Sequence, residues 1–245
     1  MQQIVRDRIA VAPDRALSFA AIMELALYDA SHGYYGRGPL RIGRSGDFYT
    51  AVSVGPLFGR LLAELAGNVW RALGMPEDFT IIEQGAHDGQ LMEDVANGLA
   101  AVDNRLAERA RFLIVERNER YRAAQAARLT PLLRSRVTWV DDLEALLSAP
   151  KQAFFMTNEL LDAFPVHRVR WTGSAWVERS VARSDDDASF VWKDSPVSDS
   201  SVKDEVDRLP RDLPPGYTTE VHPASIGWMR QVCRTGFRGA LLIAD

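Results

Sequence analysis

The chain has 245 residues, of which 47% are hydrophobic and 25% charged, values typical of a globular protein with a large buried core. Its formal charge of -4 argues against a nucleic-acid partner, because phosphate binding needs clustered Lys and Arg. The single cysteine, Cys233, excludes an internal disulfide and suits a reducing compartment.

The N-terminal sequence MQQIVRDRIAVAPDR has no apolar signal region and contains aspartates, so neither a secretory signal nor a transit peptide is expected. No uninterrupted apolar run approaches the roughly 20 residues of a membrane span. We therefore expect a cytoplasmic protein without a membrane span. The sequence indicates no oligomeric state and no metal site.

The first quarter of the chain predicts two helices separated by a long loop. Residues 18–29 have helical spacing of apolar side chains and begin at Ser18, a good N-cap. Residues 31–50 hold five glycines and three tyrosines without periodicity, which indicates an irregular and functional loop. Residues 56–74 predict an amphipathic helix that begins near Pro56 and ends at Gly74.

From residue 79 onward, short apolar runs alternate with helical patterns. The expected strands cover 79–85, 111–118, 137–143 and 153–161, and the helices between them cover 90–100, 119–129 and about 143–148. Strands with continuous apolar runs, each followed by a helix, are typical of an α/β fold whose parallel sheet is covered on both faces.

The last third of the chain predicts an insertion followed by a return to the sheet. Residues 166–181 alternate in polarity around Thr-Gly-Ser, which indicates an antiparallel β-hairpin. The Ser- and Asp-rich residues 182–206 are expected to be mobile. Residues 222–236 predict a helix and 240–245 a buried strand, at which the sequence ends. We expect the chain to stop before the last strands of the sheet and to belong to a longer protein.

Polar residues follow the expected strands where ligands bind in open parallel sheets. They are Glu83, Glu116, Asp141 with Asp142, Asn158 with Glu159, and Asp245. Each one alone could be a solvated carboxylate or a helix cap. As a set, they indicate a ligand that donates hydrogen bonds.

The stretch IIEQGAHDGQL over 81–91 resembles a cofactor loop, and Gly85, Ala86 and Gly89 would present their backbone to the ligand. It lacks the G-x-G-x-x-G spacing of dinucleotide loops, and Asp88 would repel a pyrophosphate. Glu116, at the end of the next strand, could accept both hydroxyls of a ribose. S-adenosylmethionine, a cationic nucleoside, suits these residues better than NAD does.

Four blocks give the chain a family resemblance: SFAAIMELALYDASHGYY, IGRSGDFYTAVSVGPLFGRLLA, IIEQGAHDGQL with FLIVERN, and NELLDAFPVHR. The chain resembles the MidA-type S-adenosylmethionine-dependent methyltransferases, which include a mitochondrial complex I assembly-factor arginine methyltransferase and bacterial relatives. The resemblance implies a class I, Rossmann-like methyltransferase fold. An N-terminal cap and cofactor-closing loop would cover residues 1–75, and a core over 76–245 would carry an insertion at about 166–215.

The resemblance also implies site residues. Glu83, Gly85 and Gly89 match the first cofactor motif and Glu116 the ribose acid. The block that closes over the cofactor contributes Gly46, Asp47, Phe48 and Thr50, and the block at the fourth strand contributes Asn158, Glu159 and Asp162.

The acceptor implied by the resemblance is an arginine side chain of a protein, with respiratory-complex subunits as candidates. A guanidinium needs a carboxylate to hold it and help deprotonate it. Glu159 and Asp162 could form that clamp, although Glu159 could equally contact the cofactor amino group. Two alternatives stay open, a cofactor-binding assembly factor or scaffold with little catalysis and a nicotinamide oxidoreductase.

Two departures from the family pattern bear on these expectations. His87 stands where the family has glycine, and Ala51 to Val54 replace a sequence that carries a carboxylate. If position 87 is left-handed, His costs roughly 1–2 kcal/mol there. Its ring could be structural or could lie along the cofactor.

Overall fold

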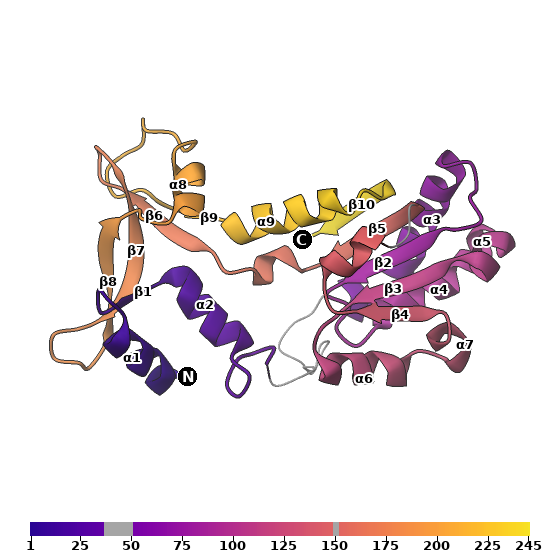
Figure 1. Cartoon of the computed structure of the whole chain (residues 1–245), viewed down its shortest axis with the longest axis horizontal. Helices are drawn as coiled ribbons and strands as arrows, with labels where there is room; N and C mark the ends of the chain where they lie inside the picture. The colour runs from indigo at the N-terminus through magenta and orange to yellow at the C-terminus, as the bar shows by residue number, and fades with distance from the viewer. Residues whose placement is uncertain (37–50, 149–151) are drawn as a thin grey trace. The chain divides into compact units, whose positions relative to one another are not determined.

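The computed structural model describes residues 1–36, 51–148 and 152–245, and the chain forms two compact units. Unit 1 comprises Met1–Arg37 and Ala163–Met229, and unit 2 comprises Gly38–Asp162 and Arg230–Asp245. Each unit contains a five-stranded sheet (Figure 1). This division differs from the expected boundary near residue 75, because helix α3 (Leu57–Ala72) packs on the sheet of unit 2.

The sheet of unit 2 is parallel throughout and has the strand order β10-β5-β2-β3-β4. Its strands are β2 (Thr80–Gln84), β3 (Arg111–Val115), β4 (Val137–Val140), β5 (Gln152–Asn158) and β10 (Arg238–Ala244). The predicted strands and the Rossmann-like fold class are thereby confirmed. β3, β4 and β5 end about three residues earlier than predicted, because pairing stops at Val115, Val140 and Asn158.

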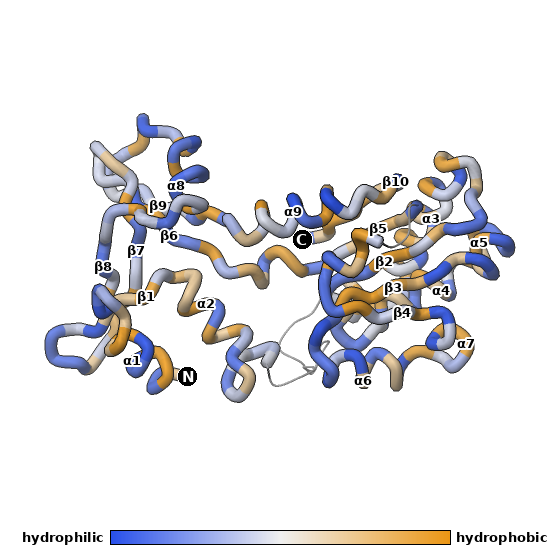
Figure 2. Tube along the Cα trace, in the orientation of Figure 1, coloured by the Kyte–Doolittle hydropathy of each residue, from blue (hydrophilic) through white to orange (hydrophobic). Residues whose placement is uncertain are grey.

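The apolar runs of the central strands are continuous because side chains are buried on both faces. Ile81, Phe112 and Phe154 belong to the core formed with α3 and α4 (Gln90–Val102). Ile82 and Phe155 are the next residues along their strands, so their side chains point to the opposite face of the sheet, and they are also buried. Figure 2 shows this concentration of hydrophobic residues along β2 and β3.

Two glycines let α3 and α4 approach each other closely. A Cβ atom at Gly59 would lie 2.3 Å from the Cβ of Asp94, and one at Gly98 would lie 2.8 Å from the Cβ of Ala63. Real Cβ atoms do not come this close, so larger residues would force the helices apart. Further helical segments of the chain are η1 (Ala51–Val54), α5 (Asn104–Arg109), α6 (Glu119–Arg128), α7 (Pro131–Arg134), η2 (Leu143–Ser148), η3 (Leu161–Ala163) and α9 (Pro223–Arg234).

The sheet of unit 1 is antiparallel and has the order β1-β7-β6-β9, with β8 paired to β7. Its strands are β1 (Ala16–Ser18), β6 (His167–Trp171), β7 (Trp176–Arg183), β8 (Phe190–Pro196) and β9 (Thr218–Val221). The predicted hairpin is confirmed as β6 and β7.

The segment over 182–206, expected to be mobile, instead forms β8 and helix α8 (Ser200–Val206). Asp199 caps α8, since its side chain accepts hydrogen bonds from the backbone N–H groups of Ser201 and Val202. Val202 and Val206 pack in the core of unit 1 against the sheet. The sequence did not predict this short helix, because Ser and Asp are frequent around it and only two of its positions are buried and apolar.

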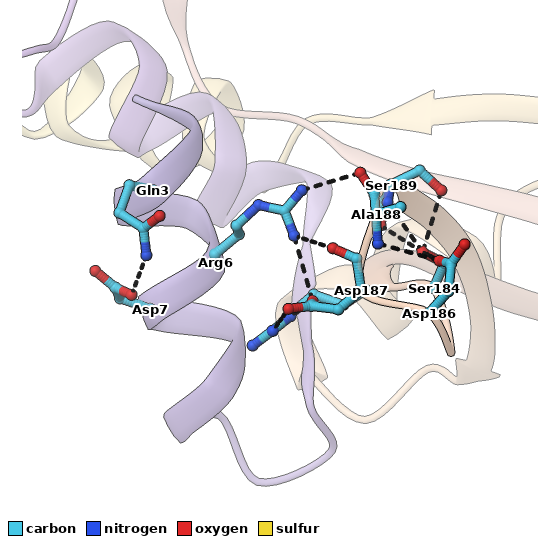
Figure 3. A network of polar contacts seen from close by, with 9 residues as sticks. Gln3, Arg6, Asp7, Ser184, Asp186, Asp187, Ala188 and Ser189 are labelled. Atoms are coloured by element: carbon cyan, nitrogen blue, oxygen red, sulfur yellow. Dashed lines mark hydrogen bonds and ion pairs between the residues drawn. The ribbon is translucent and has the colours of Figure 1, made fainter.

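Two helices occupy the N-terminal part of unit 1, α1 (Gln2–Val11) and α2 (Phe19–Tyr28). The predicted cap of α2 is confirmed, because the Ser18 hydroxyl accepts a hydrogen bond from the Ala21 N–H at 3.1 Å. α1 was not predicted. Arg6 joins it to the turn after β7, where the guanidinium donates to the carbonyls of Asp187 and Ala188 at 2.5 and 3.1 Å (Figure 3).

The long loop predicted over 31–50 is described only in its first part, where residues 31–36 form turns. Residues 37–50 lie outside the described residues. Among the helices that the structure does describe, none is long and apolar enough to cross a membrane.

Candidate cofactor-binding site

The strand register of unit 2 brings the predicted polar residues to one edge of the sheet. Gln84 pairs with Val115 on one side and with Thr157 on the other, and Val115 pairs with Val140. The residues that come next are Asp141, Glu116, Gly85 and Asn158, which therefore continue one row across four strands. Neighbouring strands lie about 4.8 Å apart, so Glu116 and Asn158 flank the start of the loop.

The loop after β2 alternates left-handed with ordinary backbone conformations. Gly85, His87 and Gly89 have φ angles of 81°, 44° and 87°. The Gly89 N–H donates to the Ala86 carbonyl at 2.6 Å, and α4 begins directly after Gly89. His87 thus adopts a left-handed conformation that glycine reaches without steric cost.

Glu83 is a buried carboxyl group at this end of β2, with 2% of its surface exposed. Its Oε2 atom has no hydrogen-bond partner among the described residues. Burial, followed by the negative charge of Asp88, raises the pKa of Glu83 to about 8. The carboxyl group is hydrogen-bonded to the Met92 backbone, so only its Oε2 atom is left without a partner in the described part of the chain. A buried acid with one free oxygen beside a ligand loop favours a cationic ligand group, which would lower that pKa and satisfy the free oxygen.

Asp88 does not present the bare charge that the sequence suggested. Arg128 of α6 donates to Asp88 Oδ2 from Nη2 at 2.6 Å and from Nε at 3.0 Å. Burial pushes the pKa of Asp88 upward, but the nearby His87 ring and Arg128 outweigh it and lower the pKa to about 2. The arginine lies forty residues away in the sequence, and no local pattern points to the pair.

Glu116 is half-buried, and its Oε1 atom accepts a hydrogen bond from the Asn118 N–H at 2.7 Å. Burial raises the pKa of this carboxyl group. Arg122 donates to the Glu116 carbonyl at 2.5 Å and forms an ion pair with Asp141 at 2.6 Å. Asp141, predicted as a cofactor residue, therefore also links β4 to α6.

The predicted acceptor residues lie at the end of β5. Glu159 has a φ of 51°, and its N–H donates to the Ala244 carbonyl at 2.7 Å. Asp245 accepts a hydrogen bond from the Leu161 N–H at 2.6 Å, so this turn is fixed to the end of β10. The residues Glu159 and Asp162 are exposed.

The remaining predicted cofactor residues, Gly46, Asp47, Phe48 and Thr50, lie outside the described residues. The segment that follows them is η1, which contains Val52. The Gln90 side chain, at the start of α4, donates to the Val52 carbonyl at 3.2 Å. η1 is therefore held next to the helix that the cofactor loop opens.

A parallel sheet, a glycine-containing loop at a helix N-terminus and an acid at the end of the next strand define a Rossmann-like protein that binds a nucleoside cofactor. Residues 61–245 match the family model described as "Putative S-adenosyl-L-methionine-dependent methyltransferase", and the chain belongs to this family. Its cofactor is S-adenosylmethionine. The free oxygen of Glu83 and the carboxylate of Glu116 fit the cationic and hydroxyl groups of that cofactor.

Two kinds of relatives are similar to this chain. The crystal structure of a Burkholderia thailandensis protein bound to S-adenosyl-homocysteine is 32% identical, with a TM-score of 0.82 over 98% of this chain and 60% of that chain. The protein arginine methyltransferase NDUFAF7, mitochondrial, of Bos taurus is 27% identical over 66% of this chain, and that of Xenopus laevis is 23% identical over 94%. The chain spans only 41% and 56% of these two curated relatives.

Proposed function

We propose that the protein transfers a methyl group from S-adenosylmethionine to an arginine side chain of a protein substrate. Family membership supports methyl transfer, and the names of the NDUFAF7 relatives support arginine as the acceptor. The observation that carries the proposal is the row formed by Glu116, Gly85 and Asn158 beside the buried acid Glu83.

In the proposed complex, Glu116, the loop and Glu83 have different tasks. Glu116 accepts hydrogen bonds from the ribose hydroxyls, as the acid at this position does in dinucleotide folds. The backbone of Gly85 to Gly89 borders the cofactor, and Glu83 compensates its positive charge. The cofactor supplies the methyl group when bound, and the protein contributes position and orientation.

The acceptor side of the proposal rests on Glu159 and Asp162. A guanidinium is a nucleophile only after it loses a proton, and its high pKa makes this loss costly without a carboxylate partner. The turn after β5 presents these two carboxylates at the surface, where they can hold a guanidinium and accept that proton. The Glu159 and Leu161 N–H groups donate to Ala244 and Asp245 at the end of β10, which fixes the backbone that carries these carboxylates.

The test is incubation of the chain with S-adenosylmethionine carrying a labelled methyl group and with protein extract, followed by amino-acid analysis of the labelled proteins. We expect label in methylarginine, and we expect Glu159→Gln and Asp162→Asn to reduce it at unchanged cofactor affinity. Glu144→Gln, on the exposed surface of η2, is the matched control. Label in another amino acid would refute the arginine assignment. Cofactor binding without any label would favour a scaffold role.

The location of the protein stays a prediction. We propose a cytoplasmic location, whereas the names of the curated relatives describe those proteins as mitochondrial. Fractionation of cells that produce the untagged protein tests the expected cytoplasmic location, and recovery in an organelle fraction would contradict it.

A further inference from the structure

Helix α6 presents three side chains to the cofactor loop, at positions that share one helix face. The Tyr121 ring lies edge-on to the His87 ring, with 5.7 Å between the ring centroids. One turn later, the Gln125 amide donates to the His87 carbonyl at 3.0 Å. Arg128 then pairs with Asp88. Two successive loop residues are thus held from the same helix.

Gln125 is the central member of this face, and it is fully buried. Its Oε1 atom accepts a hydrogen bond from the Trp139 indole N–H of β4 at 2.9 Å. An indole N–H is only a donor, so it fixes the amide with the oxygen toward Trp139 and the NH2 group toward the loop. A buried amide with both ends satisfied is a costly arrangement to build and has one stable orientation.

The point that Gln125 holds is the part of the loop where the backbone conformation is least favourable. His87 carries a Cβ atom at a φ of 44°, in a region that residues with side chains rarely adopt. A Cβ atom at Gly89 would lie 3.4 to 3.5 Å from Gln125 atoms, so the same side chain also packs against the end of the loop.

We propose that Gln125 is a positioning residue for the cofactor, which acts by fixing the His87 carbonyl and with it the left-handed path of the loop. Trp139 acts through Gln125 by orienting its amide. The inference rests on the proposed function only for the identity of the ligand. The bracing of the loop is a property of the protein alone and is measurable without cofactor.

The experiment compares the variants Gln125→Met and Trp139→Phe of the 245-residue chain with the wild type. Methionine retains the shape of glutamine and removes the donor, whereas phenylalanine stays aromatic and removes the indole N–H that orients the amide, together with part of the ring volume. Gln152→Met, the same change at the amino end of β5, is the control. Amide hydrogen exchange of residues 85–90 is measured without cofactor, and the dissociation constant of S-adenosylmethionine is measured by titration calorimetry.

We expect Gln125→Met to speed the exchange of residues 85–90 at least tenfold and to weaken cofactor binding about tenfold, while exchange within β5 stays unchanged. Trp139→Phe should show a smaller effect of the same kind and none on top of Gln125→Met. The control should change neither quantity.

Unchanged loop exchange in Gln125→Met and Trp139→Phe would overturn the inference, as would faster exchange throughout the sheet, which indicates a merely structural role. Should Gln125→Met fail to fold, Trp139→Phe decides the question through the same two measurements. If the wild type binds no S-adenosylmethionine but loop exchange is faster in the variants, the proposed function is wrong, whereas the role of Gln125 in fixing the loop is supported.

Discussion

Replacing Glu83 with glutamine should change how the stability of the protein depends on pH. The pKa of Glu83 is about 8 in the folded chain and 4.5 for an ordinary glutamate. Between these values the folded state keeps a proton that the unfolded state releases. The free energy of unfolding therefore falls as the pH rises from about 4.5 to 8, and it levels off above that. A glutamine side chain does not titrate, so the variant should lack this loss.

The size of the effect follows from the same two values. One pKa unit corresponds to about 1.36 kcal/mol, so a shift of this size amounts to roughly 3–5 kcal/mol between pH 5 and pH 8.5. Asp88, with a lowered pKa of about 2, contributes stability that is lost only as the pH falls below about 4, outside this window.

Denaturant unfolding of the wild type and of Glu83→Gln from pH 5 to pH 8.5 measures the difference. We expect the two proteins to be close in stability at pH 5 and the variant to be more stable by a few kcal/mol at pH 8.5. Parallel pH profiles would refute the reasoning, because they would mean that Glu83 is ionised in the folded chain throughout.

Three further substitutions test other parts of the structure. Glu116→Ala should weaken S-adenosylmethionine binding by about 1–3 kcal/mol, the usual cost of unpaired polar groups, and calorimetry that finds equal affinity in a folded variant would remove Glu116 from the site. His87→Gly relieves a backbone strain that costs roughly 1–2 kcal/mol, but it stabilises the unfolded state by about 0.4–1 kcal/mol through added entropy. The loop keeps its conformation at little net change in stability, so cofactor affinity should stay level or rise. A tenfold loss of affinity in that variant would instead assign the ring to the ligand. Gly59→Ala places a Cβ atom 2.3 Å from Asp94 Cβ and should destabilise the protein by about 1–3 kcal/mol, whereas an unchanged denaturation midpoint would contradict the tight packing of α3 on α4.

The parallel sheet could be predicted from the sequence because its central strands are buried on both faces. Continuous apolar runs such as those around Ile81 and Phe154 are typical of strands that are covered on both sides. The elements of unit 1 were harder, since strands such as β8 expose most of their residues and carry no clear alternation of burial. Helix α1 was missed because only Val5 and Ile9 in it are buried.

Within the candidate site, the sequence indicated the groups at the strand ends but not the groups that support them. Glu83 and Glu116 follow apolar runs, and that position alone predicts them as site residues. Gln125 and Arg128 lie on a polar helix, and their loop partners are 38 and 40 residues away. Such pairs depend on how α6 packs beside the loop, which no local spacing encodes.

The carboxyl ends of β2 and β3, with the loop between Glu83 and α4, form the site to which we assign S-adenosylmethionine. The most direct test of this assignment is equilibrium dialysis of labelled S-adenosylmethionine against the chain, with S-adenosyl-homocysteine and NAD as competitors. We expect saturable binding that S-adenosyl-homocysteine displaces and NAD does not. Absence of saturable binding, or displacement by NAD, would contradict the assignment.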